Sequence, residues 1–388
     1  MTLRRLLVVS HVCHYEHDGA IHAYGPYARE IDIWADLFPE LEIASPVRRE
    51  PPPREALRLD RANVRLRPMP ETGGSTVGAK LWQLLCLPAI VVTMARAMLA
   101  ADAVHVRCPG NLGLVGVVLA PLLRRRRVAK FAGQWNGYVN EPWTGRLQRF
   151  LLRTWWDAPV LVYGVWPDQP AHIVPFFTSM MSGDQVATAV GAAEQKVIAG
   201  PLRVLFSGRL APEKRVHALL DAVRLVVDRG VAVEVVIAGD GPERERLENQ
   251  IAGLGLDDIV TFTGPLPFAE GLTWYRWAHC LVLPSEHSEG WPKVVAEAMC
   301  HGVLCVAVDH GQIRAMLDDR GVVLSTGSAP AIADALTAIA ADPSRFEPIA
   351  LEASRWARQY SLEGLRAALA GLLSQRWRTG ISMVEQRR

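Results

Sequence analysis

The C-terminal half of the chain alternates short apolar runs with longer amphipathic segments. Apolar runs that end in polar or glycine-rich turns lie at 203–207, 233–238, 259–263, 280–284 and 303–308. Helical patterns follow them at 213–228, 242–254, 268–277, 292–301 and 312–318. This alternation predicts an α/β domain, in which helices cover both faces of a doubly wound parallel sheet. Ligands of such domains bind at the carboxyl ends of the strands.

The N-terminal half repeats the alternation less regularly. Strands are predicted at 6–10, 42–44, 104–106, 128–131 and 160–163. The strand pattern lapses between 177 and 200, and it becomes wholly helical after 327. We therefore predict one Rossmann-like domain over 1–185 and a second over 200–350. Residues 351–388 are expected to form helices that return to the N-terminal domain.

Two apolar segments could be taken for a membrane span or for a targeting segment. The window 81–99 is interrupted by Gln83, Pro88 and Arg96. A charge at the centre of a bilayer is costly, so we expect a core or surface helix there and no span. The short run after Arg5 is followed by a polar, histidine-rich stretch, which favours a first strand over a targeting segment.

Composition and charge narrow the class of protein. Half of the 388 residues are hydrophobic and 21% are charged, which excludes a disordered chain. Residues 1–180 hold 21 basic and 15 acidic residues, whereas the remainder holds 21 and 25. This asymmetry is too weak to predict nucleic-acid binding, but it favours contact of the N-terminal half with an anionic surface.

The six cysteines form no C-x-x-C pair, which favours a reduced, cytosolic compartment.

The first chemical motif runs from Ser207 to Lys214, between a predicted strand and a predicted helix. Gly208 lets a ligand approach the backbone, the helix start offers N–H groups, and Arg209 and Lys214 add two cations. Together these groups suit a diphosphate. The alternative is an ordinary loop whose basic side chains point into water.

The second motif runs from Glu289 to Glu297, again between a strand and a helix. A carboxylate beside a phosphate is repelled unless it accepts hydrogen bonds from neutral hydroxyls, and a sugar and a ribose supply these. The amides after Gly290 then face the diphosphate. The alternative is that Glu289 favours the helix N-terminus and Glu297 is a solvated helical residue.

Four motifs in order carry a family resemblance. They are 208–214, the Ala-Gly-Asp-Gly-Pro run 238–242, the segment 262–264, and the E-x7-E run within 284–299. This order resembles the family 4 retaining glycosyltransferases of the GT-B fold. The resemblance implies an α/β protein of two doubly wound Rossmann-like domains that face each other across a cleft.

The resemblance also implies roles for individual residues. Arg209 and Lys214 would bind the donor diphosphate, Glu289 would contact the donor sugar, and Glu297 would contact the ribose. Trp291 stands where phenylalanine is commoner. The full set implied for donor binding is Gly208, Gly239, Asp240, Gly241, Gly264, Gly290, Trp291, Pro292 and Glu297.

The N-terminal half departs from the family pattern. The usual glycine pair after the first strand is replaced by Asp18 and Gly19, which we assign to the acceptor side. The usual histidine after a middle strand is absent, and Gln134 or Asn136 is expected to take its hydrogen bond. His11, His14, His17 and His22 are irregularly spaced and lack an Asp-x-Asp partner, so no metal site is predicted.

The basic run Arg124–Arg127 has two interpretations. It is either a solvated helix end or a patch that draws the protein to anionic lipid or to a lipid-linked phosphate acceptor. The tryptophans of the N-terminal half likewise suit sugar stacking, a membrane interface or ordinary core packing.

The sequence therefore predicts a retaining glycosyltransferase that moves a sugar from a nucleotide-sugar to a saccharide or lipid-linked acceptor, in cell-surface polysaccharide or glycolipid synthesis. No cofactor is expected, catalysis is expected to be metal-independent, and the enzyme is expected in the cytoplasm, peripheral to the inner face of the plasma membrane. The alternatives are a GT-B nucleotide-sugar epimerase or phosphorylase, or a non-catalytic nucleotide-sugar-binding protein. A nicotinamide-dependent oxidoreductase is disfavoured because G-x-G-x-x-G is missing.

Overall fold

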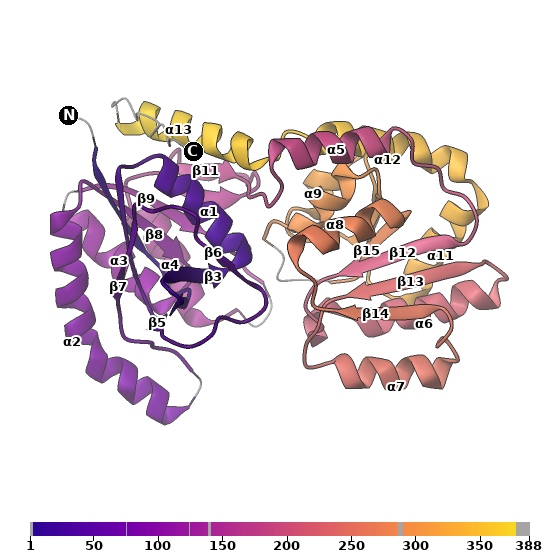
Figure 1. Ribbon diagram of the computed structural model, residues 1–388, viewed down its shortest axis with the longest axis horizontal. Helices are drawn as coiled ribbons and strands as arrows, with labels where there is room; N and C mark the ends of the chain where they lie inside the picture. Colours follow the sequence, from indigo (N-terminus) through magenta and orange to yellow (C-terminus); the bar gives the residue numbers. More distant parts are fainter. Residues whose placement is uncertain (1–2, 75, 124, 139–140, 286–289, 378–388) are drawn as a thin grey trace. The chain divides into compact units, whose positions relative to one another are not determined.

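The chain folds into two compact units, Met1–Met180 together with Leu362–Arg388, and Met181–Ser361. The structure is a computed structural model (Figure 1), and it describes residues 3–74, 76–123, 125–138, 141–285 and 290–377. Each unit contains its own parallel sheet with helices on both faces, so the predicted pair of doubly wound α/β domains is confirmed.

The first unit is built on a seven-stranded sheet in the order β11-β10-β9-β8-β1-β4-β7. All its pairings are parallel. The strands are β1 (Arg5–Val9), β4 (Glu40–Ser45), β7 (Val64–Pro68), β8 (Ala103–Cys108), β9 (Arg126–Phe131), β10 (Val160–Tyr163) and β11 (Ile173–Phe176). A parallel sheet of this kind needs cover on both faces.

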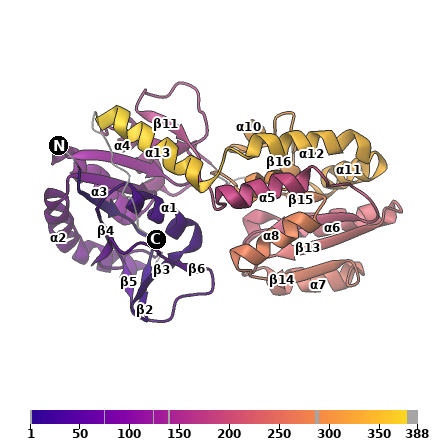
Figure 2. The ribbon, with the colours of Figure 1, turned by 45° about the horizontal axis from the view of Figure 1, so that its top comes forward.

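Alternate side chains of β1 face two separate cores. Leu6 and Val8 belong to the core formed with α1 (Gly25–Asp36) and α13 (Leu362–Trp377). Leu7 and Val9 belong to the core on the other face, which is covered by α2 (Val77–Ala100), α3 (Asn111–Leu122) and α4 (Trp143–Thr154). Figures 1 and 2 show α2 at the periphery of this unit.

A small second sheet in this unit has the order β5-β2-β3-β6. Its strands are β5 (Val47–Arg48), β2 (His14–His17), β3 (Ala20–Tyr24) and β6 (Ala56–Arg58). Asp18 and Gly19 form the two-residue turn between β2 and β3, with φ of 49° and 70°. Two consecutive positive φ values are the requirement of a type I′ hairpin, which favours Asp-Gly. The sequence analysis did not predict this sheet because its strands are only two to five residues long.

The second unit has a six-stranded parallel sheet in the order β14-β13-β12-β15-β16-β17. The strands are β12 (Leu202–Ser207), β13 (Val233–Ala238), β14 (Val260–Gly264), β15 (Cys280–Leu283), β16 (Leu304–Val308) and β17 (Val322–Leu324). Strand order reverses between β12 and β15, which is where ligands of open parallel sheets bind.

The helices of the second unit are α5 (Gly183–Ala193), α6 (Val216–Asp228), α7 (Arg244–Leu254), α8 (Phe268–Trp277), α9 (Lys293–Cys300), α10 (Ile313–Leu317), α11 (Ala329–Ala341) and α12 (Pro343–Ala357). The predicted boundary at 350 falls inside α12, which lies wholly in this unit. Only α13 belongs with the N-terminal residues, through the buried Leu365, Leu369 and Leu373 on one face of the helix.

One predicted helix begins later than expected. Pro212–Lys214 forms a 3₁₀ turn, η1, and Arg215 follows with a left-handed φ of 53°. The left-handed residue ends the turn, so α6 begins at Val216 rather than at residue 213.

The apolar window 81–99 forms most of α2. By length and composition, α2 is the one helix in the described part of the chain that could cross a membrane. Its second half packs into the core through Ile90, Met94, Ala97 and Met98. Most of its first half is exposed. The sequence analysis expected either a core helix or a surface helix, and α2 is a surface helix in its first half and a core helix in its second.

Candidate functional site

In the second unit, three glycine-containing loops meet at the carboxyl ends of β12, β13 and β14. The Gly208 amide donates to the Ala238 carbonyl at 3.0 Å, and the Gly239 amide donates to the Gly264 carbonyl at 3.0 Å. The Leu210 amide donates to the Asp240 carbonyl at 2.9 Å. These backbone bonds join three motifs that the sequence analysis assigned to the donor.

Gly239 is the tightest point of this junction. A Cβ built on it would lie 1.9 Å from the Gly208 carbonyl oxygen, and its φ is +141°. Gly241 is similar, because a Cβ there would lie 2.3 Å from the Leu210 carbonyl oxygen. The Asp240 carboxylate accepts a bond from the Gly241 amide at 2.8 Å. Backbone therefore contacts backbone across the loops, and larger residues would separate them.

The two predicted cations lie on the loop that follows β12. Arg209 is exposed directly after Gly208, and Lys214 is half-buried at the end of η1. The Lys214 amide donates to the Ala211 carbonyl at 2.9 Å, so the 3₁₀ turn uses this N–H group. The structure thus keeps both cations on one strand-end loop but takes them off the N-terminus of α6, where the sequence analysis placed them.

Glu297 connects the second motif to the first. It is buried on α9, and its Oε2 accepts a hydrogen bond of 2.9 Å from the Tyr275 hydroxyl. Tyr275 also hydrogen-bonds with Ser207, the last residue of β12. Burial raises the pKa of Glu297, against the opposing effects of the Tyr275 bond and the Lys293 charge. The carboxylate is therefore fixed in position beside the loop that carries Gly208.

Sequence reasoning missed Tyr275. It stands on α8, 22 residues before Glu297, and neither its spacing nor its neighbours mark it as a partner of that residue. Only the packing of α8 against α9 brings the two side chains together.

The other residues of the second motif surround the start of α9. Pro292 precedes the helix, and Trp291 is buried against the Tyr360 ring, with 5.0 Å between ring centroids. Gly290 is half-buried in the loop before them. Glu289, predicted to contact the donor sugar, lies outside the described residues. Trp291 thus anchors the loop to the segment after α12.

The first unit has a cavity at the carboxyl ends of β8 and β9. Its volume is about 210 Å³, and Gln134 lines it together with Pro109, Gly110, Phe131 and Tyr138. The Gly110 amide at the start of α3 donates to the Gln148 side chain at 3.0 Å. Strand ends of a doubly wound sheet are the expected place for a ligand.

The other residues predicted for the acceptor side, Asn136, Asp18 and Gly19, do not line this cavity. Asn136 is exposed and does not line the cavity, although it follows Gln134 by two residues. Asp18 and Gly19 form the hairpin turn of the small sheet, and this turn accounts for the Asp-Gly pair without a ligand. Of the four predicted residues, Gln134 is the one that lines the cavity.

A buried ion-pair triad supports the strands that carry the cavity. Arg107 of β8 and Lys130 of β9 are register partners, and Glu30 of α1 bonds to both at 2.7 and 2.8 Å. Burial alone would raise the pKa of Glu30, but the charges of Arg107 and Lys130 hold it well below its ordinary value. Three charges without water are tolerable only when paired in this way.

The histidines near β1 do not gather around a common centre. His14 is buried, with its Nδ1 2.8 Å from Ser45 Oγ, and burial lowers the pKa of His14 to about 4. His17 pairs instead with Asp18 in the hairpin turn at 3.3 Å. In the described part of the chain, no group of three or more His, Cys, Asp or Glu side chains could hold a metal ion.

Comparison with known sequences finds a family match within the second unit. Residues 201–342 match the family Glycosyl transferases group 1. Alpha-D-kanosaminyltransferase of Streptomyces kanamyceticus is 34% identical over 172 residues, which cover 44% of each chain. D-inositol 3-phosphate glycosyltransferase of Kribbella flavida is 29% identical over 319 residues, covering 71% of this chain and 74% of that one. The match to the first of these relatives thus spans less than half its length.

Comparison with solved structures confirms the GT-B fold. HepE of Anabaena in complex with UDP-glucose superimposes with a TM-score of 0.68 and 17% identity, and the alignment covers 96% of this chain and 99% of HepE. The fold predicted from the four motifs is therefore confirmed over nearly the whole chain. The two relatives named above are glycosyltransferases, which agrees with the class predicted from the motifs of the second unit.

Proposed function

We propose that this protein is a retaining glycosyltransferase of family 4, which moves a sugar from a nucleotide-sugar to a hydroxyl of a saccharide or lipid-linked acceptor. One observation carries the proposal. The glycine loops after β12, β13 and β14 are joined backbone to backbone beside Arg209 and Lys214, within the matched segment 201–342. Close backbone approach with two cations suits a diphosphate.

Charge on the leaving diphosphate is the main chemical demand of the reaction. Arg209 and Lys214 supply positive charge on the loop after β12, which can neutralise it. In the proposed same-face reaction, the acceptor oxygen forms a bond to the anomeric carbon while the bond to the diphosphate breaks. The acceptor attacks from the face that the diphosphate leaves, so configuration is retained, and a donor phosphate oxygen takes the acceptor proton.

Glu297 and Glu289 would hold the sugars on either side of the diphosphate. The fixed carboxylate of Glu297, held by Tyr275, would accept hydrogen bonds from the ribose. Glu289 would contact the donor sugar. We propose metal-independent catalysis, because two side-chain cations can neutralise the leaving group. UDP-sugars are the first donors to test, since HepE was solved with UDP-glucose.

The cavity beside Gln134 is the proposed acceptor site. Its lining includes Gln134 and Tyr138, and an amide and a phenol can hydrogen-bond a sugar hydroxyl. Gln134→Ala should raise KM for the acceptor and leave KM for the donor unchanged. Synthesis of a cell-surface polysaccharide or glycolipid, in the cytoplasm and at the inner face of the plasma membrane, is the proposed setting.

The deciding experiment measures release of nucleoside diphosphate from UDP-, GDP- and ADP-sugars, with and without saccharide acceptors. Arg209→Ala and Lys214→Ala should each lower kcat/KM by about 100- to 1,000-fold. Arg358→Ala, an exposed arginine at the end of α12, is the matched control and should retain full activity. Wild-type activity in both loop variants would overturn the diphosphate assignment.

The same experiment separates the alternatives. An epimerase would isomerise the nucleotide-sugar without an acceptor, and a phosphorylase would need a sugar phosphate. A non-catalytic binding protein would show nucleotide-dependent thermal stabilisation with no turnover. The anomeric proton coupling of the product, measured by NMR, reports retention or inversion.

A further inference from the structure

An unusually large share of the exposed apolar side chains lies on three neighbouring helices. In the described part of the chain, thirteen of sixteen exposed large hydrophobic side chains belong to α2, α3, α4 and the following Trp155. We call these thirteen side chains the apolar face. Leu84 and Leu85 on α2 are 65% and 67% exposed, and Phe150 on α4 is 61% exposed. An exposed apolar patch of more than a few side chains marks an interaction surface.

The three helices form one continuous layer. They cover the same face of the seven-stranded sheet, and α3 contacts both α2 and α4. The Trp155 indole donates to the Val118 carbonyl of α3 at 3.4 Å, which ties the end of α4 to α3. The apolar face therefore belongs to a single side of the first unit.

The first half of α2 is apolar around much of its circumference. Leu81, Trp82, Leu84, Leu85 and Leu87 are all exposed, although they point in different directions around the helix. A groove on a protein partner would cover one stripe of a helix, whereas an apolar medium covers all of it. This half of α2 suits partial immersion in lipid.

The charges on these helices have one sign. The α2, α3 and α4 segments contain Lys80, Arg96, Arg146, Arg149 and Arg153, and no Asp or Glu. Glu141, just before α4, pairs with Arg146 and Arg149. Exposed tryptophan and leucine beside a predominance of cations are typical of a surface that lies in the interface of an anionic bilayer.

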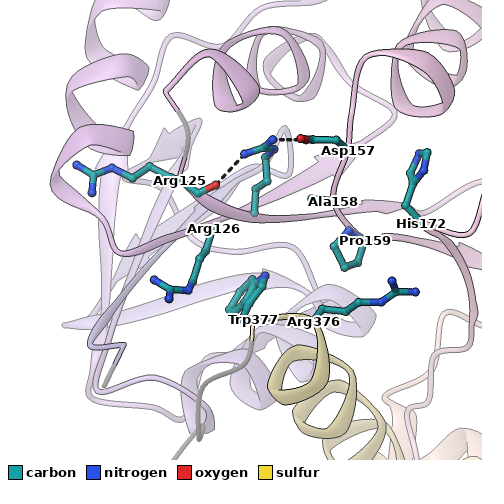
Figure 3. Close-up of a pocket in the computed structure, with 9 residues that line it drawn as sticks. Arg125, Arg126, Asp157, Ala158, Pro159, His172, Arg376 and Trp377 are labelled. Carbon is teal, nitrogen blue, oxygen red and sulfur yellow. Dashed lines mark hydrogen bonds and ion pairs between the residues drawn. The ribbon is translucent and has the colours of Figure 1, made fainter. Parts of the chain in front are cut away.

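Further arginines border the apolar face where α2 and α4 end. The Arg125 guanidinium donates to the Leu99 carbonyl in the last turn of α2 at 2.6 Å. Arg125, Arg126 and Arg376 line a pocket of about 290 Å³, in which Arg127 pairs with Asp157 (Figure 3). Figure 3 shows Arg126 and Arg376 on opposite sides of Trp377. Arg124 lies outside the described residues.

We propose that the apolar face is a membrane-docking surface, with the first half of α2 in the headgroup region and Arg126 and Arg153 paired with lipid phosphates. The proposal deepens the membrane setting given under Proposed function, because it assigns the contact to named residues. The described arginines of the basic run then lie at the edge of the apolar face, and the apolar side chains supply most of the binding to the bilayer.

The test is co-sedimentation of the full chain with vesicles of phosphatidylcholine, with or without about 30% phosphatidylglycerol. Wild type should bind the anionic vesicles and bind the neutral ones more weakly. The triple variant Leu81→Gln, Leu84→Gln, Leu85→Gln should lose at least about tenfold in partitioning. Its matched control is Val165→Gln with Val197→Gln, two exposed valines outside the face, which should bind like wild type.

A charge arm uses Arg126→Gln with Arg153→Gln. Binding to anionic vesicles should fall by about fivefold for each arginine, and binding to neutral vesicles should not change. The control is Arg54→Gln with Arg358→Gln, two exposed arginines outside the three helices. Alkaline carbonate should release the bound wild-type protein, because docking at the interface is not a span.

Several results would overturn the proposal. These are failure of wild type to bind anionic vesicles, wild-type binding by the triple variant, or carbonate resistance, which would indicate that α2 spans. A dimer that the triple variant dissociates in vesicle-free buffer would assign the face to a second copy of the chain. Nucleoside diphosphate release with a soluble acceptor is measured in parallel, so loss of docking with retained turnover leaves the proposed function standing.

Discussion

Replacing Gly239 by alanine tests the junction of the donor loops. The added Cβ would lie 1.9 Å from the Gly208 carbonyl oxygen and 2.9 Å from its carbonyl carbon. Because a carbon and a carbonyl oxygen normally stay roughly 3.3 Å or more apart, the loops after β12 and β13 must separate by over about 1 Å. That movement disturbs the bonds from Gly208 to Ala238 and from Leu210 to Asp240.

The cost has two parts. Backbone strain of an alanine at φ +141° contributes on the order of 1–3 kcal/mol. Two weakened backbone hydrogen bonds contribute about 1 kcal/mol each. We therefore expect Gly239→Ala to lower the free energy of unfolding by about 3–5 kcal/mol and to abolish the thermal stabilisation caused by nucleotide-sugar.

Urea unfolding followed by circular dichroism measures the first quantity, and a thermal-shift titration measures the second. Gly271→Ala is the matched control, since Gly271 lies within α8 and a Cβ there meets no atom within 4 Å. Alanine in a helix interior should stabilise by about 0.5–1 kcal/mol. The reasoning is refuted if Gly239→Ala unfolds within about 1 kcal/mol of wild type and keeps its nucleotide shift.

Tyr275→Phe removes the hydroxyl that holds Glu297, so we expect a stability loss of about 1–3 kcal/mol and a higher KM for donor; unchanged urea unfolding and unchanged KM would contradict this. Burial and the charges of Arg203 and Lys196 lower the pKa of His279 to about 4. The unfolded histidine binds its proton near 6.5, so stability present above pH 6.5 is lost toward pH 4, by about 2 kcal/mol at pH 5. His279→Gln should flatten the measured stability profile over this range, and an equally steep profile would count against the assignment. Excess EDTA should leave the transfer rate unchanged, whereas a rate that collapses and recovers with added metal would revive a metal site.

The sequence predicted the parts of the fold that depend on near neighbours. The apolar runs of β12, β13 and β15 are mostly buried, so apolar residues follow one another with little interruption and mark these strands clearly. The glycine loops were found for the same reason, because each loop directly follows such a strand.

Features that depend on distant partners were not predicted. Tyr275 meets Glu297 only through helix packing, and Gln148 reaches Gly110 across 38 residues. The strand β7 was not predicted because it lies at a sheet edge, where polar residues such as Arg65 and Arg67 interrupt its apolar pattern. The start of α6 was misplaced because no local pattern signals that Arg215 adopts a left-handed conformation.

The triad of Glu30, Arg107 and Lys130 constrains how the N-terminal unit can change. Substitution of Glu30 alone would leave two adjacent buried cations without an anionic partner. Substitution of Arg107 or Lys130 alone would weaken the ion pair of Glu30 with the remaining cation. Intermediates on a one-at-a-time mutational route are therefore penalised. Chimaeras that aim to alter acceptor choice should transplant α1, β8 and β9 as one inherited block.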